Sequence, residues 1–121
     1  MDRYEKSYYL YGMGIESLEQ EEFEKALDYF KQSLLLEEHF RTNARIYECL
    51  MSLGKFTEAR PYIEIAYKMN KGHDKVSMQY VGEIVKEGKI SEAVSILEGI
   101  LVRNASYNPA RKLLEKICID K

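Results

Sequence analysis

The sequence predicts an all-α fold in which pairs of helices are stacked in series, and three observations support this prediction. The segment GKFTEARPYI, which begins at Gly54, returns as GKISEAVSIL at Gly88, 34 residues later. Recurrence at a fixed interval is typical of one folding unit stacked on another. The 121 residues include only two prolines and seven glycines, which favours long regular elements over a turn-rich β fold. Apolar residues between the copies recur at helical spacing.

A third copy of the segment lies upstream, where EEFEKALDYF begins at Glu21. Ala26 precedes Ala59 by 33 residues, and Ala59 precedes Ala93 by 34 residues. A small residue at this position lets two antiparallel helices approach closely, so we expect the three alanines at helix crossings. Large apolar residues lie three positions before and four positions after each alanine: Phe23 and Phe30, Phe56 and Ile63, Ile90 and Leu97.

Each copy is expected to form two helices, which divides the chain into repeats of about residues 7–39, 40–73 and 74–106. A seventh helix, of about residues 108–119, should follow the repeats. Such a helix caps the array, because the last repeat would otherwise expose its apolar core. We expect the whole chain, residues 1–121, to form one domain of ordinary size.

Local signals predict where several of these helices begin and end. Gly54 should end the first helix of the second repeat in the left-handed conformation that glycine adopts readily. Thr57 and Ser91 are the expected N-caps of the second helices in repeats two and three. In the last helix, Asn108 is the expected N-cap and Pro109 the first helical residue, where proline is already in the required conformation.

Helix pairs of 34 residues with this pattern resemble tetratricopeptide repeats over about residues 7–105. The signature glycine of the first helix is present only once, since Tyr47 and Val81 take its place later, and the usual closing proline is absent. The resemblance implies a right-handed superhelical helix-turn-helix solenoid of seven helices. It further implies that the first helix of each pair lines a concave groove that binds peptides or protein segments. The matching sites are Gly14, Ala26, Phe30, Gly54, Ala59, Gly88 and Ala93.

The first helix carries two apolar stripes, although one is enough to reach a core. Leu10, Met13, Gly14 and Ser17 should face the partner helix. Tyr4, Tyr8, Tyr11, Ile15 and Leu18 form the second stripe, which falls on the groove side if the resemblance holds. We interpret this second stripe as a binding or self-association surface, and the alternative is that the fold buries it.

Bases from the later repeats are expected on the same groove. Tyrosine and methionine suit a binding surface, because tyrosine covers much area with few rotamers and methionine adapts its shape. Arginine can hold a carboxylate through two parallel hydrogen bonds, so the expected ligand is apolar with an acidic group. The alternative is that these bases are simply solvated. The expected groove residues are Tyr8, Tyr11, Ile15, Arg41, Arg45, Met51, Lys75 and Met78.

One ligand type of the resembling family is not expected. Tetratricopeptide proteins that dock chaperones hold a C-terminal carboxylate with a Lys and Asn pair, then an Asn, then a Lys and Lys or Arg pair. The corresponding residues here are Tyr11 and Ile15, then Arg45, then Lys75 and Gln79. Only Lys75 matches, so the sequence argues against this carboxylate clamp.

Catalytic, metal and cofactor sites are not indicated. His39 and His73 are expected at the C-terminal ends of helices, where the helix dipole favours a cation. Two histidines without a nearby cysteine pair make a poor metal site, and no phosphate-binding loop or nucleophile motif occurs. The expected groove holds Tyr, Ile and Met and the net charge is −2, which argues against nucleic acid as a partner.

Charge and cysteine content complete the expectations. Residues 1–38 hold ten acids and four bases, a balance of −6, whereas residues 39–75 hold seven bases and four acids, a balance of +3. Cys49 and Cys118 are expected to be free thiols in a reducing compartment. The N-terminus lacks the features of a secretion signal, and no segment has the apolar length of a membrane span, so the cytoplasm is the expected location.

The sequence therefore favours a non-catalytic protein–protein interaction module that binds a peptide or protein segment in its groove, with no cofactor, metal, membrane or nucleic acid. Two alternatives remain open. One is a homodimer that associates through the tyrosine stripe, and the other is an accessory subunit of an enzyme complex.

Overall fold

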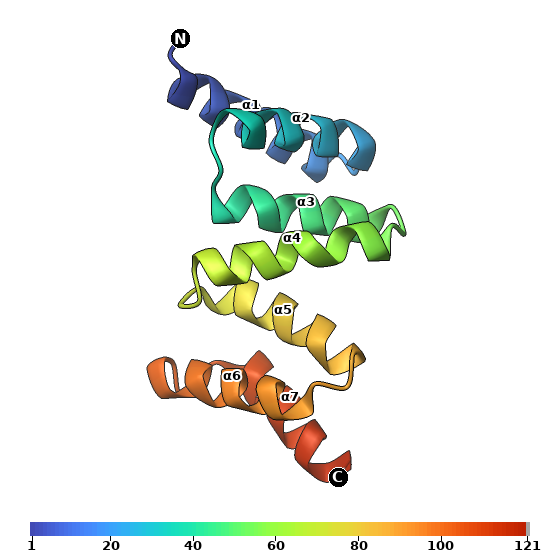
Figure 1. The fold of residues 1–121 in the computed structure, drawn as a ribbon, viewed down its shortest axis with the longest axis vertical. Helices are drawn as coiled ribbons and strands as arrows, with labels where there is room; N and C mark the ends of the chain where they lie inside the picture. Colours follow the sequence, from blue (N-terminus) through green and yellow to red (C-terminus); the bar gives the residue numbers. More distant parts are fainter. Residues whose placement is uncertain (121) are drawn as a thin grey trace. The chain divides into compact units, whose positions relative to one another are not determined.

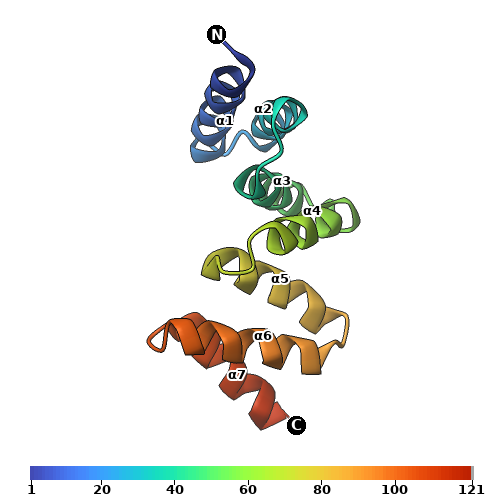
Figure 2. The same ribbon diagram turned by 60° about the vertical axis from the view of Figure 1, so that its left-hand side comes forward.

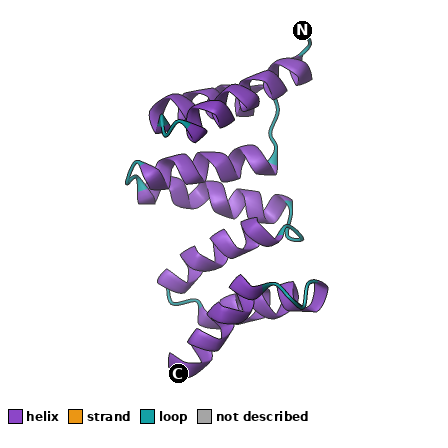
Figure 3. Cartoon of the chain, turned by 180° about the vertical axis from the view of Figure 1, so that it is seen from behind, coloured by secondary structure: helices purple, strands orange, loops and turns teal. Residues whose placement is uncertain are grey.

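The computed structural model describes residues 1–120, which form seven α-helices and no strand (Figures 1 and 3). The predicted all-α class and the predicted number of helices are confirmed. Short connections join consecutive helices along the chain. The helices are α1 (Arg3–Glu19), α2 (Phe23–Leu36), α3 (Phe40–Ser52), α4 (Phe56–Met69), α5 (Asp74–Lys86), α6 (Ile90–Arg103) and α7 (Asn108–Asp120).

The described chain divides into two compact units. The first unit, Met1–Met69, contains α1 to α4, and the second begins at Asn70 and contains α5 to α7. In the first unit α1 packs against α2, α2 against α3, and α3 against α4. In the second unit α5 packs against α6 and α6 against α7. Within each unit, helices that follow one another in the chain therefore pack against each other, as the α1–α2 and α3–α4 pairs show in Figure 2.

Alanines lie at the helix contacts, as the repeat predicts. Ala26, Ala59 and Ala93 are completely buried, and each is followed four positions later by a completely buried large side chain. A methyl group at these positions lets the facing backbone approach, and the larger neighbours fill the remaining space. The completely buried large residues that follow the alanines are Phe30, Ile63 and Leu97.

Three tight turns join the helices within the pairs, and all three use the same hydrogen bonds. At the end of α3, Gly54 N donates to Met51 O at 3.0 Å, and Lys55 N donates to Leu50 O at 2.8 Å. The residue that donates the first of these two bonds adopts a positive φ, which is 75° at Gly54 and 79° at Gly88. In the α1–α2 turn this residue is Glu21, with φ 59°. Its backbone is therefore in the left-handed conformation at a steric cost that the glycines of the other two turns avoid.

Four predictions for helix starts are wrong, by two residues at Thr57 and Ser91 and by one residue at Asn108 and Pro109. Thr57 and Ser91 each occupy the second position of their helices, since α4 begins at Phe56 and α6 at Ile90. The residue before α6 makes no side-chain cap. The last helix begins at Asn108, which places Pro109 at its second position. The glycines with positive φ, Gly54 and Gly88, each lie two residues before the helix that follows, so they mark the starts of α4 and α6 better than Thr57 and Ser91 do.

The prediction for the two histidines is also wrong. His39 and His73 are the N-caps of α3 and α5, not residues at helix C-terminal ends. The Nδ1 atom of His39 accepts a hydrogen bond from Arg41 N at 3.2 Å, and that of His73 accepts one from Val76 N at 3.3 Å. Each ring thus satisfies a backbone donor that the first helical turn leaves unpaired.

Candidate functional site

Hydroxyl groups and a glycine set the close packing of α1 on α2. Ser7 Oγ donates to Ser33 O at 3.0 Å, and Ser33 Oγ donates to Ser7 O at 2.7 Å. Gly14 lies against the ring of Phe30, where a Cβ atom would come within 2.6 Å of Phe30 Cε1. These small residues bring the helix axes together, and the exposed tyrosines Tyr4 and Tyr8 lie away from this contact.

The outer side of α1 carries the tyrosine stripe that the sequence predicts as a binding surface. Tyr8 is 81% exposed and Tyr4 is 65% exposed. Tyr11 is half-buried, and its ring lies 5.4 Å from that of Phe30 in a tilted arrangement. The stripe is therefore anchored at Tyr11 and open at Tyr4 and Tyr8, and the alternative that the first unit buries all of it is excluded.

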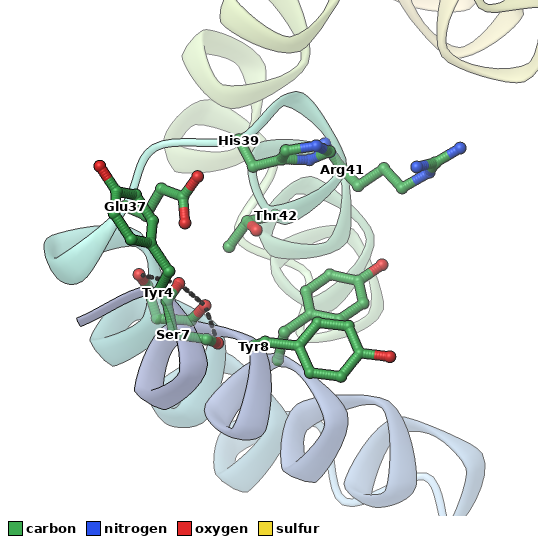
Figure 4. A pocket seen from close by; sticks show the side chains of 9 residues that line it. Tyr4, Ser7, Tyr8, Glu37, His39, Arg41 and Thr42 are labelled. Atoms are coloured by element: carbon green, nitrogen blue, oxygen red, sulfur yellow. Dashed lines mark hydrogen bonds between the residues drawn. The ribbon is translucent and has the colours of Figure 1, made fainter. Parts of the chain in front are cut away.

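A pocket of about 210 Å³ lies where three helix ends of the first unit meet. The start of α1 contributes the tyrosines, the end of α2 contributes Ser33 and Glu37, and the start of α3 contributes the remaining side chains. Figure 4 shows Tyr4 and Glu37 on one side of the pocket and Arg41 extending away from them. The lining residues are Tyr4, Ser7, Tyr8, Tyr11, Ser33, Glu37, His39, Arg41 and Thr42.

The hydroxyl groups of Ser7 and Ser33, at the floor of the pocket, already have hydrogen-bond partners. Both hydroxyls are used in the bonds between α1 and α2, and their oxygens lie 3.0 Å apart. Ser7, Ser33 and Thr42 are all buried. The groups of the pocket that still lack a partner are therefore the charged side chains of its rim and not the hydroxyls of Ser7 and Ser33.

Two charged side chains at the pocket have no ionic partner among residues 1–120. The guanidinium of Arg41 is exposed and lies 5.1 Å over the ring of Phe40, and no carboxylate of the described chain pairs with it. Glu37 is a half-buried residue, and its carboxylate receives no hydrogen bond or ion pair within the same residues. The rim thus offers one unpaired charge of each sign.

Arg45, by contrast, is already engaged. Its Nε donates to Tyr11 Oη at 3.3 Å, and its Nη1 pairs with Glu48 Oε1 at 3.4 Å. Burial alone would lower the pKa of the Arg45 guanidinium, but the hydrogen bond to Tyr11 and the charge of Glu48 raise it above its ordinary value. Arg45 therefore stays charged and holds the tyrosine in place, which links α3 to α1.

The first unit brings together part of the predicted site. Tyr8, Tyr11 and Arg41 line the pocket, and Arg45 reaches it through Tyr11. The other predicted residues lie outside the pocket. Ile15 and Met51 are half-buried in the first unit, and α5 of the second unit carries the exposed Lys75 and the half-buried Met78.

Sequence reasoning missed most of the residues that α2 and the α2–α3 connection contribute. Ser33, Glu37, His39 and Thr42 have no pattern that separates them from solvated helix ends. A signal was available for Ser33 alone. Ser7 and Ser33 are small polar residues on two helices that were expected to pack together, which indicates a close contact between them. Tyr4 was recognised as part of the stripe but was not included among the predicted groove residues.

No group of three or more His, Cys, Asp or Glu residues lies close enough to hold a metal ion within residues 1–120. Over the same residues, none of the helices combines the length and the apolar character that crossing a membrane requires.

Comparisons with known proteins give the fold a name. No family model matches the sequence, and no curated protein sequence matches it. The Arabidopsis OM64 TPR domain has a TM-score of 0.82 at 14% identity, with 99% of this chain and 100% of that chain covered. The first TPR domain of Spaghetti (RPAP3), bound to the HSP90 peptide SRMEEVD, has a TM-score of 0.81 at 19% identity, with 96% and 93% covered.

A third similar structure is the Yersinia enterocolitica type III secretion chaperone SycD in complex with a peptide of the translocator YopD. Its TM-score is 0.77 at 16% identity, and the match covers 93% of this chain and 92% of that chain. At these identities the likeness concerns the fold, which is the tetratricopeptide-repeat fold that the sequence resembles.

Proposed function

We propose that this chain, whose fold is that of tetratricopeptide-repeat domains, is a non-catalytic module that binds a peptide or protein segment at the face formed by α1 and α3. The observation that carries the proposal is the pocket beside α1, where exposed tyrosines surround a hollow with an unpaired arginine at its rim. Two of the similar structures hold peptides, which is consistent with this use of the fold.

The tyrosine surface is the apolar part of the proposed site. Tyr4 and Tyr8 expose large rings that no packing requirement of α1 explains, since Leu10 and Gly14 already face α2. Exposed aromatic area next to a hollow is typical of binding surfaces, and tyrosine loses little side-chain entropy when a partner covers it. Ile15 and Met51 extend this surface along the two helices in the proposed site.

The acidic group of the proposed ligand pairs with Arg41. Arg45 is the other arginine of this face, but its guanidinium already interacts with Tyr11 and Glu48. Arg41 has no such partner within residues 1–120 and presents its planar donors at the rim. In the second unit, Lys75 and Met78 on α5 are separately proposed as ligand contacts. The carboxylate clamp is not part of the proposal, because only Lys75 of its residue set occurs here.

A capture experiment with matched variants tests the proposal. The immobilised full chain is compared with the double variant Tyr8→Ala, Arg41→Glu and with a control, Tyr9→Ala, Lys31→Glu. Tyr9 is 54% exposed on the same helix but does not line the pocket, and Lys31 is exposed on α2. Circular dichroism establishes that all three chains are folded.

We expect bound proteins, identified by mass spectrometry, to be lost from the pocket variant and retained by the control. Equal capture by all three chains would contradict the proposal. Self-association is the competing use of the same surface. Light scattering at two concentrations detects it, and a dimer that Tyr8→Ala dissociates would replace peptide binding as the function.

A further inference from the structure

Glu37 is the feature of the pocket that a purely apolar or acidic ligand leaves unexplained. Glu37 is a half-buried residue that lines the pocket, and its carboxylate has no hydrogen-bond or ionic partner in residues 1–120. Carboxylates that lose contact with water are normally paired, because an unpaired one forfeits part of its hydration. A ligand that covers the pocket would remove still more water from Glu37, so the ligand must supply a compensating cation.

The walls of the pocket suit the same cation. Tyr4, Tyr8 and Tyr11 surround the hollow with aromatic rings, and a cation over such rings is attracted by their quadrupoles. Tyr4 lies on the Glu37 side of the pocket in Figure 4. The Ser7–Ser33 floor, whose hydroxyls donate to backbone oxygens across the helix pair, carries no charge of its own.

The size of the pocket fits a long side chain. Its volume of about 210 Å³ exceeds the ~150 Å³ of an apolar cavity that admits a benzene molecule. A lysine side chain has one non-hydrogen atom fewer than benzene. Its methylene stem can pack on tyrosine rings while its charged end reaches a carboxylate, as long basic side chains commonly do.

The surrounding charges favour a base at the Glu37 end and an acid at the other end. Residues 1–38, which include α1 and α2, have a balance of ten acids against four bases. Arg41 on the rim extends away from Glu37 in Figure 4, and its guanidinium lies over the ring of Phe40. Arg3 at the start of α1 donates its Nε–H to the backbone oxygen of Leu36, and no ion pair links it to Glu37 in the described chain.

We infer that the pocket receives a lysine or arginine side chain of the bound segment, whose stem lies between the tyrosines and whose charge pairs with Glu37. This inference rests on the proposed function and adds the chemistry of the partner. The bound segment then carries a basic residue at Glu37 and an acidic group at Arg41, which orients it along α1 and α3.

Small probes test the inference without a known partner. The full chain, labelled with nitrogen-15, is titrated with N-acetyl-lysine amide and with N-acetyl-norleucine amide, which has nearly the same stem but no charge. The variants are Glu37→Gln and, as the matched control, Glu38→Gln, which alters a neighbour that does not line the pocket. Amide shifts of residues 4–11 and 37–42 report binding at the pocket.

We expect the lysine probe to bind about three- to tenfold more tightly than the norleucine probe, as a desolvated cation among aromatic rings does. Glu37→Gln should abolish this preference, and Glu38→Gln should retain it. The inference is overturned if norleucine binds as well as lysine, if Glu37→Gln keeps the preference, or if neither probe shifts the pocket amides.

Failure of this inference is distinguishable from failure of the proposed function. If the captured partners depend on Tyr8 and Arg41 but the probes show no preference for a cation, the module binds peptides without a basic anchor. If the captured partners do not depend on Tyr8 and Arg41, the proposed function itself is wrong.

Discussion

Helices α1 and α3 are both the first helices of their pairs, yet they bury different amounts of side chain. α1 has 17 residues and buries only Ser7, Leu10, Gly14 and Ser17. α3 has 13 residues and buries seven, among them Ile46, Cys49 and Leu50. The reason is position, since α3 packs against both α2 and α4, whereas the main contact of α1 is with α2. The exposed Tyr4 and Tyr8 of α1 are therefore available to a ligand, whereas the buried apolar residues of α3 stabilise the fold.

The largest expected difference between the two helices is in large-to-small substitutions. Leu50 on α3 is 1% exposed, so Leu50→Ala should lower the free energy of unfolding by about 2–5 kcal/mol through lost contacts and a cavity. Tyr8→Ala on α1 should change it by no more than about 0.5 kcal/mol, because Tyr8 is exposed. Urea unfolding followed by circular dichroism measures both, and equal effects would refute the assignment of α1 as the open helix.

Thiol reactivity sharpens the comparison within the folded chain. Burial, followed by the charge of Glu48, raises the pKa of Cys49 on α3 to about 11, although Arg45 opposes this shift. At pH 8 about one Cys49 thiol in a thousand is then ionised, so Cys49 should react with an aromatic disulfide reagent only after unfolding. Cys118 on α7 is exposed and should react in the native state.

The same shift gives a pH dependence with a defined sign. The pKa of Cys49 is higher in the folded chain than the ordinary value of about 8.5 expected after unfolding. Its contribution to stability is therefore complete below about pH 8.5 and declines as the pH rises toward 11. Equal native reactivity of the two thiols would show that α3 is less enclosed than its burial indicates.

Substitutions at two glycines of α1 distinguish the side of the helix that packs on α2 from the side that is open. Gly14→Ala places a Cβ atom 2.6 Å from the ring of Phe30, which is completely buried, so a loss of about 1–3 kcal/mol is expected. A Cβ atom on Gly12 would meet no other part of the molecule within 4 Å, and Gly12→Ala should instead stabilise the helix by up to about 1 kcal/mol. Thermal unfolding distinguishes the two, and a stabilising Gly14→Ala would contradict the packing of α1 on α2.

The smallest expected effect compares the turns that follow α1 and α3. Glu21 and Gly54 both have positive φ, but only glycine adopts it without steric cost. Glu21→Gly should stabilise the chain by about 1 kcal/mol, and Gly54→Ala should destabilise it by about the same amount. Denaturant midpoints at constant slope measure both changes, and a destabilising Glu21→Gly would show that the Glu21 side chain has a compensating role.

Helix pairing could be predicted from the sequence because its signals are local and repeated. Ala26, Ala59 and Ala93 are buried and Gly54 has a positive φ, as expected, and Gly88 has a positive φ at the equivalent turn. The caps were less predictable. His39 and His73 became N-caps because the connections end at these residues, and nothing in their composition distinguishes that role from one at a helix C-terminal end.

By itself, the sequence determined that helices recur in pairs and that α1 carries more apolar side chains than one contact surface requires. Only the tertiary structure decided which of these side chains stay open and which charges accompany them. Glu37 and Arg41 meet the tyrosines because the α2–α3 connection returns the chain to the start of α1. Periodicity reports which side of a helix is apolar, but charge pairing depends on distances between residues that are far apart in the chain.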